Sequence, residues 1–258
     1  MKNFSLCTNC MGRRAQLEQT LPHNLEVLKQ FPNFELLLLD YNSPDGFGSW
    51  VENSFQEETN SGILGFYRSF GPAAYVMTHA KNACHLLAGG EIVTNLDGDN
   101  FITPAYLRFV ENSFAGKNER FYIALNGPGI GSRISLYKSA FLKIGGYDED
   151  LGIGWGPDDF DLTLRLFHLG FGRISTPNVW LFGPTLEHPD EQRNELTAHK
   201  LPKRETHARN LALVVENARS KHHIANAGRR WGEIEVFRPG GARFNIAAEN
   251  GLLLRSGS

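Results

Sequence analysis

Long apolar runs, abundant cysteine and a strong excess of charge are all missing from this sequence of 258 residues. No apolar run approaches the ~20 residues that a membrane-spanning helix needs, and no hydrophobic stretch follows Met1 and Lys2 as in a secretion signal. Three cysteines are too few for a disulfide framework and fit a reducing compartment. A formal net charge of −2 argues against nucleic-acid binding. We therefore expect a cytoplasmic globular protein with no nucleic-acid partner.

Cys7 and Cys10 have the spacing of a redox pair or of half a zinc site. The other half of a zinc site, a second such pair or two nearby histidines, is missing from the sequence. We therefore interpret the two cysteines as small apolar residues at the end of a strand.

The first 40 residues predict a strand–helix–strand unit. Near-continuous apolar runs at residues 4–8 and 34–39 are typical of parallel strands that are buried on both faces. Between them, residues 13–31 carry leucines at helical spacing. Pro22 lies inside this helix and is expected to kink or restart it.

The rest of the chain predicts an open α/β sheet. Further strands are expected at residues 63–67, 91–96, 121–125, 134–137, 173–175 and 179–182. Further helices are expected at residues 73–88, 104–114, 138–144 and 158–169. The two kinds of element alternate up to about residue 115 and are mixed afterwards, which predicts a mixed sheet flanked by helices. Ligands of such sheets bind at the carboxyl ends of the parallel strands.

The last third of the chain is basic, because Lys and Arg far outnumber Glu between residues 199 and 230. One face of a helix in this region would carry the apolar residues Ala208, Leu211, Val214, Val215 and Ala218. We predict a helical C-terminal extension, residues 196–258, whose basic face is either simply solvated or attracted to an anionic acceptor, a nucleotide or a membrane surface.

Asp97-Gly98-Asp99 directly follows a predicted buried strand. Two carboxylates separated by a glycine can turn toward one hard divalent cation, which would also neutralise a bound diphosphate. A plain turn is the alternative interpretation of the same three residues.

A second acidic cluster runs from Gly154 to Asp161 and contains Trp155, Asp158 and Asp159. A tryptophan between glycines presents a flat face suited to stacking on a sugar ring. The carboxylates open a predicted helix, where the helix dipole favours their ionised form, and Asp158 is a candidate N-cap. The alternative is a capped helix that follows a Gly-rich turn and has no role in chemistry.

Taken together, these motifs resemble the inverting GT-A-fold glycosyltransferases of the family-2-like type and, in the second half, the beta-galactosyltransferases. The resemblance covers residues 4–195, about three quarters of the chain. The segments that carry it are residues 8–13, 39–43, 79–82, 97–99, 141–149, 155–161 and 187–195.

This resemblance implies a GT-A domain over residues 1–195, with a nucleotide half up to about residue 100 and an acceptor half after it. The implied nucleotide-sugar ligands are Thr8, Asn9, Arg13, Asp40, Lys81, Asn82 and Gly98. The implied ligands of a Mn²⁺ or Mg²⁺ ion are Asp97, Asp99 and His188. Acceptor or sugar contacts are implied for Trp155, Gly156 and Asp161. The implied general base is Asp159, with Asp158 as the alternative.

The implied reaction transfers a sugar from a nucleotide-sugar, expected to be a UDP-sugar, to a hydroxyl of a carbohydrate, lipid-linked or peptide acceptor. The chain departs from the family pattern at Pro157, where Gly is usual, at Asp158, where Glu is usual, and at Tyr41, where a second Asp is usual. The Gln-x-x-Arg-Trp segment of processive synthases has Ala227 at its first position, so we expect a single-transfer enzyme.

Two other functions are compatible with parts of the pattern. A nucleotidyltransferase that makes nucleotide-sugars would need a Gly-rich basic loop near the N-terminus, for which Gly12-Arg13-Arg14 is the only candidate. A catalytically inactive sugar-binding protein on the same scaffold is the other, but the retained Asp158 and Asp159 argue against it.

Overall fold

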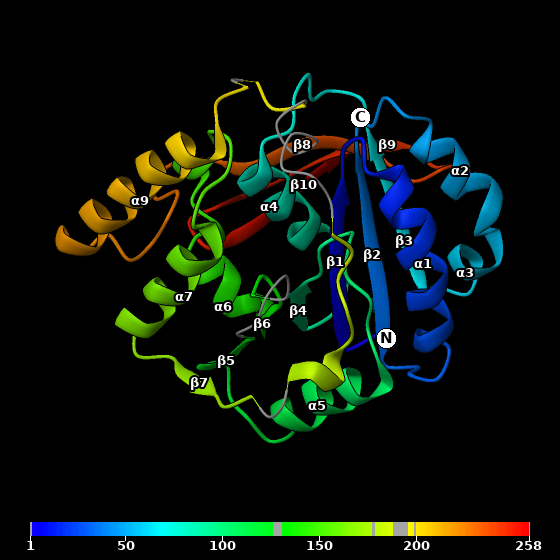
Figure 1. Cartoon of the computed structure of the whole chain (residues 1–258), viewed down its shortest axis with the longest axis horizontal. Helices are drawn as coiled ribbons and strands as arrows, with labels where there is room; N and C mark the ends of the chain where they lie inside the picture. Colours follow the sequence, from blue (N-terminus) through cyan, green and yellow to red (C-terminus); the bar gives the residue numbers. More distant parts are fainter. Residues whose placement is uncertain (1, 126–130, 177–178, 188–195, 199, 258) are drawn as a thin grey trace.

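The computed structural model describes residues 2–125, 131–176, 179–187, 196–198 and 200–257. Over these residues the chain forms one ten-stranded sheet with the order β10-β9-β8-β3-β2-β1-β4-β6-β5-β7 and helices on both faces (Figure 1). The strands are β1 (Phe4–Cys10), β2 (Phe34–Tyr41), β3 (Leu64–Ser69), β4 (Ile92–Asn95), β5 (Phe121–Ala124), β6 (Ile134–Tyr137), β7 (Gly172–Ile174), β8 (Trp231–Phe237), β9 (Arg243–Glu249) and β10 (Leu252–Gly257).

The described helices fall between these strands and before β8. The α-helices are α1 (Arg14–Leu28), α2 (Phe47–Ser54), α3 (Gln56–Asn60), α4 (Met77–Leu87), α5 (Pro104–Phe114), α6 (Lys138–Lys143), α7 (Asp158–His168) and α9 (Lys203–Arg219). Two 3₁₀ turns, η1 (Glu149–Leu151) and η2 (Val179–Phe182), complete the set. Residues 179–182 were expected to form a strand and instead form η2.

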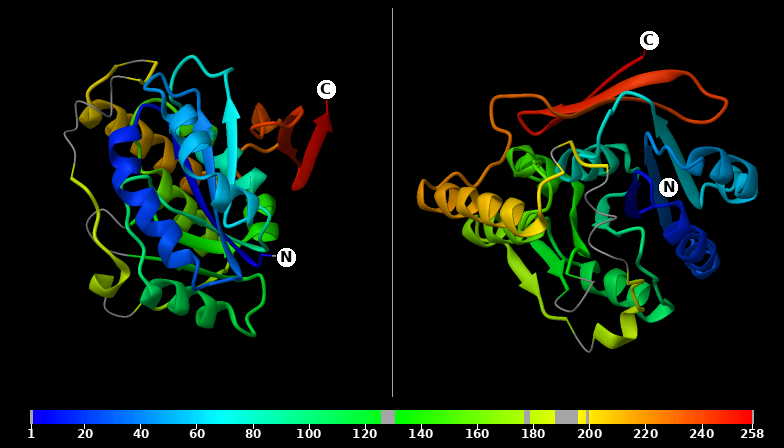
Figure 2. Two further views of the ribbon diagram at one scale, coloured as in Figure 1. Left: turned by 90° about the vertical axis from the view of Figure 1, so that its right-hand side faces the viewer. Right: turned by 45° about the horizontal axis from the view of Figure 1, so that its top comes forward.

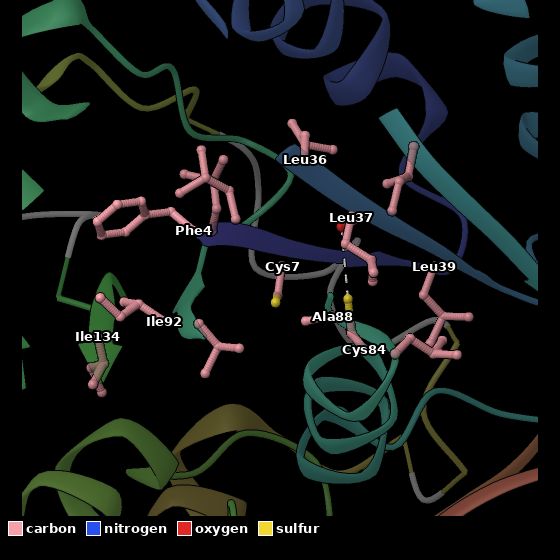
Figure 3. Packing of buried hydrophobic residues seen from close by; sticks show 14 of the residues in the cluster. Phe4, Cys7, Leu36, Leu37, Leu39, Cys84, Ala88, Ile92 and Ile134 are labelled. Carbon is pink, nitrogen blue, oxygen red and sulfur yellow. Dashed lines mark hydrogen bonds between the residues drawn. The ribbon is translucent and has the colours of Figure 1, made fainter. Parts of the chain in front are cut away.

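The N-terminal half is the parallel part of the sheet. Strand β1 pairs in parallel with β2 and with β4, and β2 pairs in parallel with β3. The residues from Leu36 to Leu39 are buried because helices cover both faces of β2. Figure 3 shows Cys84 and Ala88, from α4 and its C-terminal end, facing β1 and β2, with the Cys84 thiol directed at the Leu37 carbonyl. The parallel strands therefore end at one common edge, where ligands of such sheets bind.

Helix α1 is continuous through Pro22, contrary to the expected kink or restart. Proline removes one backbone N–H, and its ring crowds the carbonyl four residues earlier, which is that of Glu18. The neighbouring Leu17, Leu21 and Leu25 are buried against the sheet. Their packing holds the helix together across the missing hydrogen bond.

Beyond α5 the strand directions are mixed, as the sequence predicts. Strand β6 is antiparallel to β4 and to β5, and β7 is parallel to β5. The turn after β6 and α6 leads to η1 and then to the loop at residues 152–157, which precedes α7. This half therefore brings α7 back to the edge where β1 and β4 end.

The C-terminal region is not the helical extension that its composition suggested. Among the described residues from 200 to 257, α9 is the one helix, and β8, β9 and β10 form an antiparallel meander. This meander joins the main sheet where Phe237 of β8 pairs with Arg68 of β3. Figure 2 shows it as a ribbon along one side of the molecule.

The buried face of α9 also differs from the predicted apolar stripe. Leu211 and Val215 are 38% and 40% exposed, whereas Thr206, Asn210 and Val214 are buried. The α9 helix therefore packs through two polar side chains and one apolar one. No helix in the described part of the chain is long and apolar enough to cross a membrane. Contact of α9 with a membrane surface is a separate expectation and stays a prediction.

Candidate active site

A cavity of about 280 Å³ opens at the edge where β1 and β4 end. It is bordered by the loop after β1, the loop after β4, the N-terminal ends of α4 and α7, and residues 196–197. The predicted site residues that line this cavity are Asn9, Arg13, Lys81, Asp97, Gly98, Asp99, Trp155, Gly156, Asp158 and Asp159. The fold thus brings most of the predicted donor, metal and catalytic residues to one place.

Asp97 is oriented by Asn95, the last residue of β4, and by Ser132, which lies in the turn before β6. Its Oδ1 accepts a hydrogen bond from Asn95 Nδ2 at 2.9 Å, and its Oδ2 accepts one from Ser132 Oγ at 2.6 Å. Asp99 Oδ1 accepts a hydrogen bond from the side chain of Asn100. A carboxylate has about four lone-pair sites in all, and both Asp97 and Asp99 line the cavity.

The loop that carries Asp97 and Asp99 is held in place by hydrogen bonds from buried side chains. Thr20 Oγ1 donates to the Gly98 carbonyl at 2.6 Å, and Asn24 Nδ2 donates to the Asn100 carbonyl at 2.9 Å. Arg133 is fully buried, and its Nε donates to Asn100 Oδ1 at 2.7 Å. Sequence reasoning missed Arg133, since nothing in its local sequence shows that it lies beneath the Asp97–Asp99 loop.

The donor set at this loop fits a hard divalent cation. Oxygen ligands suit Mg²⁺ and Mn²⁺, and Asp97 and Asp99 both face the cavity. Among the described residues, no cluster of three or more His, Cys, Asp or Glu side chains forms a complete metal site. The predicted third ligand, His188, lies outside the described residues. Mg²⁺ is commonly held by one or two carboxylates together with substrate phosphates, and Asp97 and Asp99 would be such a pair.

Asp158 and Asp159 begin α7, and Lys81 of α4 lies against both. The Lys81 Nζ atom donates to Asp158 Oδ2 at 2.6 Å and to Asp159 Oδ1 at 2.9 Å. Asp158 is the first residue of the helix rather than its predicted N-cap, because Pro157 occupies that position. The Lys81 side chain is almost completely buried, and its ammonium lies 4.9 Å from the centre of the Tyr147 ring.

The two carboxylates differ in their access to the cavity. The Asp158 side chain is 3% exposed, whereas the Asp159 side chain is 30% exposed. Burial, reinforced by the neighbouring Asp158 carboxylate, raises the pKa of Asp159 to about 7. Burial also raises the pKa of Asp158. For Lys81, burial alone would lower the pKa, but the two carboxylates outweigh it and raise that pKa well above its usual value. Of the two carboxylates, Asp159 therefore combines greater access to the cavity with a pKa near neutral pH.

Several predicted ligands serve the fold rather than lining the cavity. Thr8 Oγ1 donates to the Leu96 carbonyl at 2.8 Å, which ties β1 to the residue that follows β4. Asn82 Nδ2 donates to the Tyr147 carbonyl at 2.9 Å, and Asp161 Oδ2 accepts from Arg165 Nε at 2.8 Å. None of these three predicted residues lines the described cavity.

Asp40, near the end of β2, does not line the described cavity and is held by two partners. Its Oδ1 accepts from the Ser43 backbone N–H at 2.8 Å, and its Oδ2 accepts from Arg68 Nε at 3.2 Å. Burial raises the pKa of Asp40, although Ser43 and Arg68 act in the opposite direction. The side chain shapes the loop after β2, and its predicted contact with the nucleobase stays a prediction.

The cysteine pair has the role that the sequence suggested. Cys7 and Cys10 are both buried in β1 and neither is in a disulfide. The Cys10 Sγ atom lies 3.6 Å from Ser43 Oγ, and burial raises the pKa of the Cys10 thiol to about 12. Such a thiol is neither a thiolate nucleophile nor a ready metal ligand.

Comparisons with known proteins found a matching family model and solved structures with a similar fold. Residues 113–189 match the family model described as the N-terminal domain of galactosyltransferase. This segment contains Trp155, Asp158 and Asp159, and it also includes His188 in the sequence. No curated protein sequence matches the chain.

Two solved structures share the fold at 17% sequence identity. The mannosyltransferase PcManGT from Pyrobaculum calidifontis, in complex with GDP-Man and Mn²⁺, has a TM-score of 0.64 over 84% of this chain and 64% of its own. S. aureus TarS 1–349 in complex with UDP has a TM-score of 0.54 over 85% of this chain and 72% of its own. The chain therefore spans less than two thirds of the mannosyltransferase's length. The predicted GT-A fold is confirmed, and residues 113–189 carry a glycosyltransferase-family domain.

Proposed function

We propose that this chain is an inverting, metal-dependent glycosyltransferase. It would move a sugar from a nucleoside-diphosphate sugar, a UDP-sugar by preference, to an acceptor hydroxyl. One observation carries the proposal: Asp159, with its raised pKa, lines the same cavity as Asp97 and Asp99 at the edge where the parallel strands end. The match to a galactosyltransferase family model and the fold shared with donor-bound transferases support it.

Asp97 and Asp99 would hold Mn²⁺ or Mg²⁺, with His188 as a further ligand. The bound ion would neutralise the charge that develops on the leaving diphosphate. The protein's own part is to keep the two carboxylates turned toward the cavity, which the hydrogen bonds from Asn95, Ser132 and Asn100 do. Asn9 and Arg13, at the end of β1 and in the loop after it, lie where the nucleotide would enter.

Asp159 would act as the general base. The acceptor O–H donates its proton to the Asp159 carboxylate while the oxygen attacks the anomeric carbon. The bond from that carbon to the diphosphate breaks, and the nucleoside diphosphate leaves with the bonding electrons. Attack on the face opposite the diphosphate inverts the anomeric configuration. Asp158 is less suited to this role, because its side chain is only 3% exposed, whereas that of Asp159 is 30% exposed.

Trp155 would provide the sugar-stacking surface of the acceptor half. It lies in the loop immediately before α7 and lines the cavity together with Gly156. Aromatic faces and carbohydrate rings pack through apolar C–H surface, and the neighbouring carboxylates bind hydroxyl groups. A carbohydrate acceptor, free or attached to a lipid or peptide, fits this lining.

The test is a donor panel followed by product analysis. UDP-galactose, UDP-N-acetylglucosamine and GDP-mannose are each incubated with a mixture of sugar acceptors and Mn²⁺, Mg²⁺ or EDTA. Release of nucleoside diphosphate that requires the metal, together with an inverted anomeric proton coupling by NMR, is the expected result. Pyrophosphate release from a nucleoside triphosphate would instead identify a nucleotidyltransferase. A rise in melting temperature without turnover would indicate a sugar-binding protein.

Replacing Lys81 by methionine is expected to shift the pH dependence of transfer to higher pH. In the wild-type protein the rate rises as Asp159 loses its proton, with an apparent pKa no higher than about 7, because a divalent cation near Asp97 would lower it further. Removing the ammonium that contacts Asp159 should raise this apparent pKa by about 1–3 units. Rate profiles between pH 5 and 9 measure the shift.

Lys81→Arg is the matched control, since it keeps the positive charge and should leave the profile near that of the wild type. A Lys81→Met protein that is folded and shows an unshifted profile would contradict the assignment of Asp159 as the base.

A further inference from the structure

The loop that presents Trp155 has little regular structure of its own. Residues 152–157 lie between η1 and α7, and Gly154 has a φ of +64°. Backbone groups in such a loop need hydrogen-bond partners from elsewhere in the protein. Two side chains of α9, Thr206 and Asn210, provide them.

Thr206 and Asn210 lie within hydrogen-bond distance of four backbone groups in and beside this loop. Thr206 Oγ1 accepts from the Trp155 N–H at 3.1 Å. Asn210 Nδ2 lies 2.9 Å from the Leu151 carbonyl, 3.2 Å from that of Ile153 and 3.4 Å from that of Trp155. Both side chains are buried, with exposures of 1% and 0%.

The orientation of the Asn210 amide is set by its neighbour on the helix. Arg209 Nη1 donates to Asn210 Oδ1 at 2.7 Å. The amide oxygen is therefore taken up by Arg209, and the NH₂ group faces the three carbonyls. The ammonium group of Lys203, also on α9, lies over the Trp155 ring at 5.7 Å from the ring centre.

The glycines on either side of Trp155 are explained by the same contact. A Cβ added to Gly154 would lie 2.5 Å from Thr206 Cγ2, and one added to Gly156 would lie 2.3 Å from Asn210 Nδ2. Any larger residue at either position would push α9 away. The Gly-Trp-Gly sequence is thus fitted to this face of α9 as well as to the cavity.

We propose that α9 is part of the acceptor site, with Thr206 and Asn210 as positioning residues that hold Trp155 against the cavity. This inference rests on the proposed function, because it deepens the role given there to Trp155. It assigns a function to a helix that lies outside the matched residues 113–189 and beside α7 in Figures 1 and 2. It also explains why the buried face of α9 is polar.

The experiment compares Thr206→Val with Thr206→Ser. Valine has nearly the same shape as threonine but cannot accept the hydrogen bond from the Trp155 N–H, whereas serine retains the hydroxyl. Val214→Ala is the control for simple destabilisation, because Val214 is buried on the same face of α9 and makes no hydrogen bond to the loop. All three proteins are compared with the wild type at a temperature at which they are folded.

The first measurement is acrylamide quenching of the Trp155 fluorescence, obtained by subtracting the signal of each protein's Trp155→Phe counterpart. The second is titration with free galactose, mannose and N-acetylglucosamine, followed by the same fluorescence, and with UDP and Mn²⁺ by calorimetry. We expect Thr206→Val to increase quenching and to weaken sugar binding by about three- to tenfold, the scale of one lost hydrogen bond. Thr206→Ser and Val214→Ala should behave like the wild type, and UDP binding should be unchanged throughout.

Equal quenching in Thr206→Val and the wild type would overturn the positioning role. The same change in Val214→Ala would overturn it too, because loss of stability would then be a sufficient cause. If no sugar affects Trp155 in the wild-type protein, the acceptor site lies elsewhere and the inference fails at that point. Failure of the proposed function would look different, since metal-dependent UDP binding or donor turnover would then be missing from the wild-type protein.

Discussion

Replacing Asp159 by asparagine is expected to reduce turnover by about 10²- to 10⁴-fold, the contribution of a positioned general base. The amide keeps the size of the side chain but cannot take the proton of the acceptor hydroxyl. Binding of UDP with Mn²⁺ should be retained, because Asp97 and Asp99 are untouched. Initial rates of nucleoside diphosphate release, with calorimetry for binding, measure both effects.

Asp161→Asn is the matched control for this experiment. Asp161 lies in the same first turn of α7, but its carboxylate is paired with Arg165 and does not line the cavity. This change should lower the free energy of unfolding and leave turnover close to the wild-type value. Full activity in Asp159→Asn, or an equal loss in Asp161→Asn, would remove Asp159 from the mechanism.

Replacing Asp97 and Asp99 together by asparagine is expected to weaken UDP binding in the presence of Mn²⁺ by at least about tenfold, because the ion is then left with phosphate and water ligands only. EDTA should have the same effect on the wild-type protein. Asparagine keeps an oxygen that can accept the hydrogen bonds from Ser132 and Asn100, so the loop should stay folded. Calorimetric titrations at several Mn²⁺ concentrations give the affinities.

Asp150→Asn serves as the control, since Asp150 is 60% exposed and pairs with Arg229 away from the cavity. Its UDP affinity should equal that of the wild type and show the same dependence on Mn²⁺. An affinity for UDP that is unaffected by both EDTA and the double substitution would rule out a metal at Asp97 and Asp99.

The central part of the fold and much of the site could be predicted because their signals are local. The apolar run at Leu36–Leu39 predicts a strand buried on both faces, and an acidic turn after a buried strand points to the sheet edge where ligands bind. The short segment Trp155-Gly156-Pro157-Asp158-Asp159 likewise predicts the start of a helix, with the two aspartates near that edge. These expectations depend on residues that are close together in sequence.

The pairing of Lys81 with Asp158 and Asp159 could not be predicted in this way. These residues are more than 70 positions apart, and only the packing of α4 against α7 brings them together. Arg133 and Asn210 are also distant in sequence from their partners, by 33 positions from Asn100 and by 55 from Trp155. Each is a polar side chain whose partner is a backbone or amide group far away in the sequence.

The C-terminal strands were missed although a signal for them was present. The residues of β8 alternate between buried and exposed from Gly232 to Val236, and Asn250-Gly251, with φ angles of 49° and 78°, forms the turn between β9 and β10. An Asn-Gly pair between alternating segments is a strong hairpin signal. The prediction of a helical extension was based on the basic residues before residue 230 and was applied to the whole C-terminal region. Charge content, however, carries no information about the two-residue alternation of a strand.

The most direct test of the account is a crystal of the protein soaked with MnCl₂ and UDP, measured for anomalous scattering from manganese. The account predicts a manganese peak in contact with Asp97 and Asp99, with the diphosphate of UDP bound to it and Asp159 within reach of the open side of the cavity. A map with UDP bound elsewhere, or with no manganese beside these two aspartates, would contradict it.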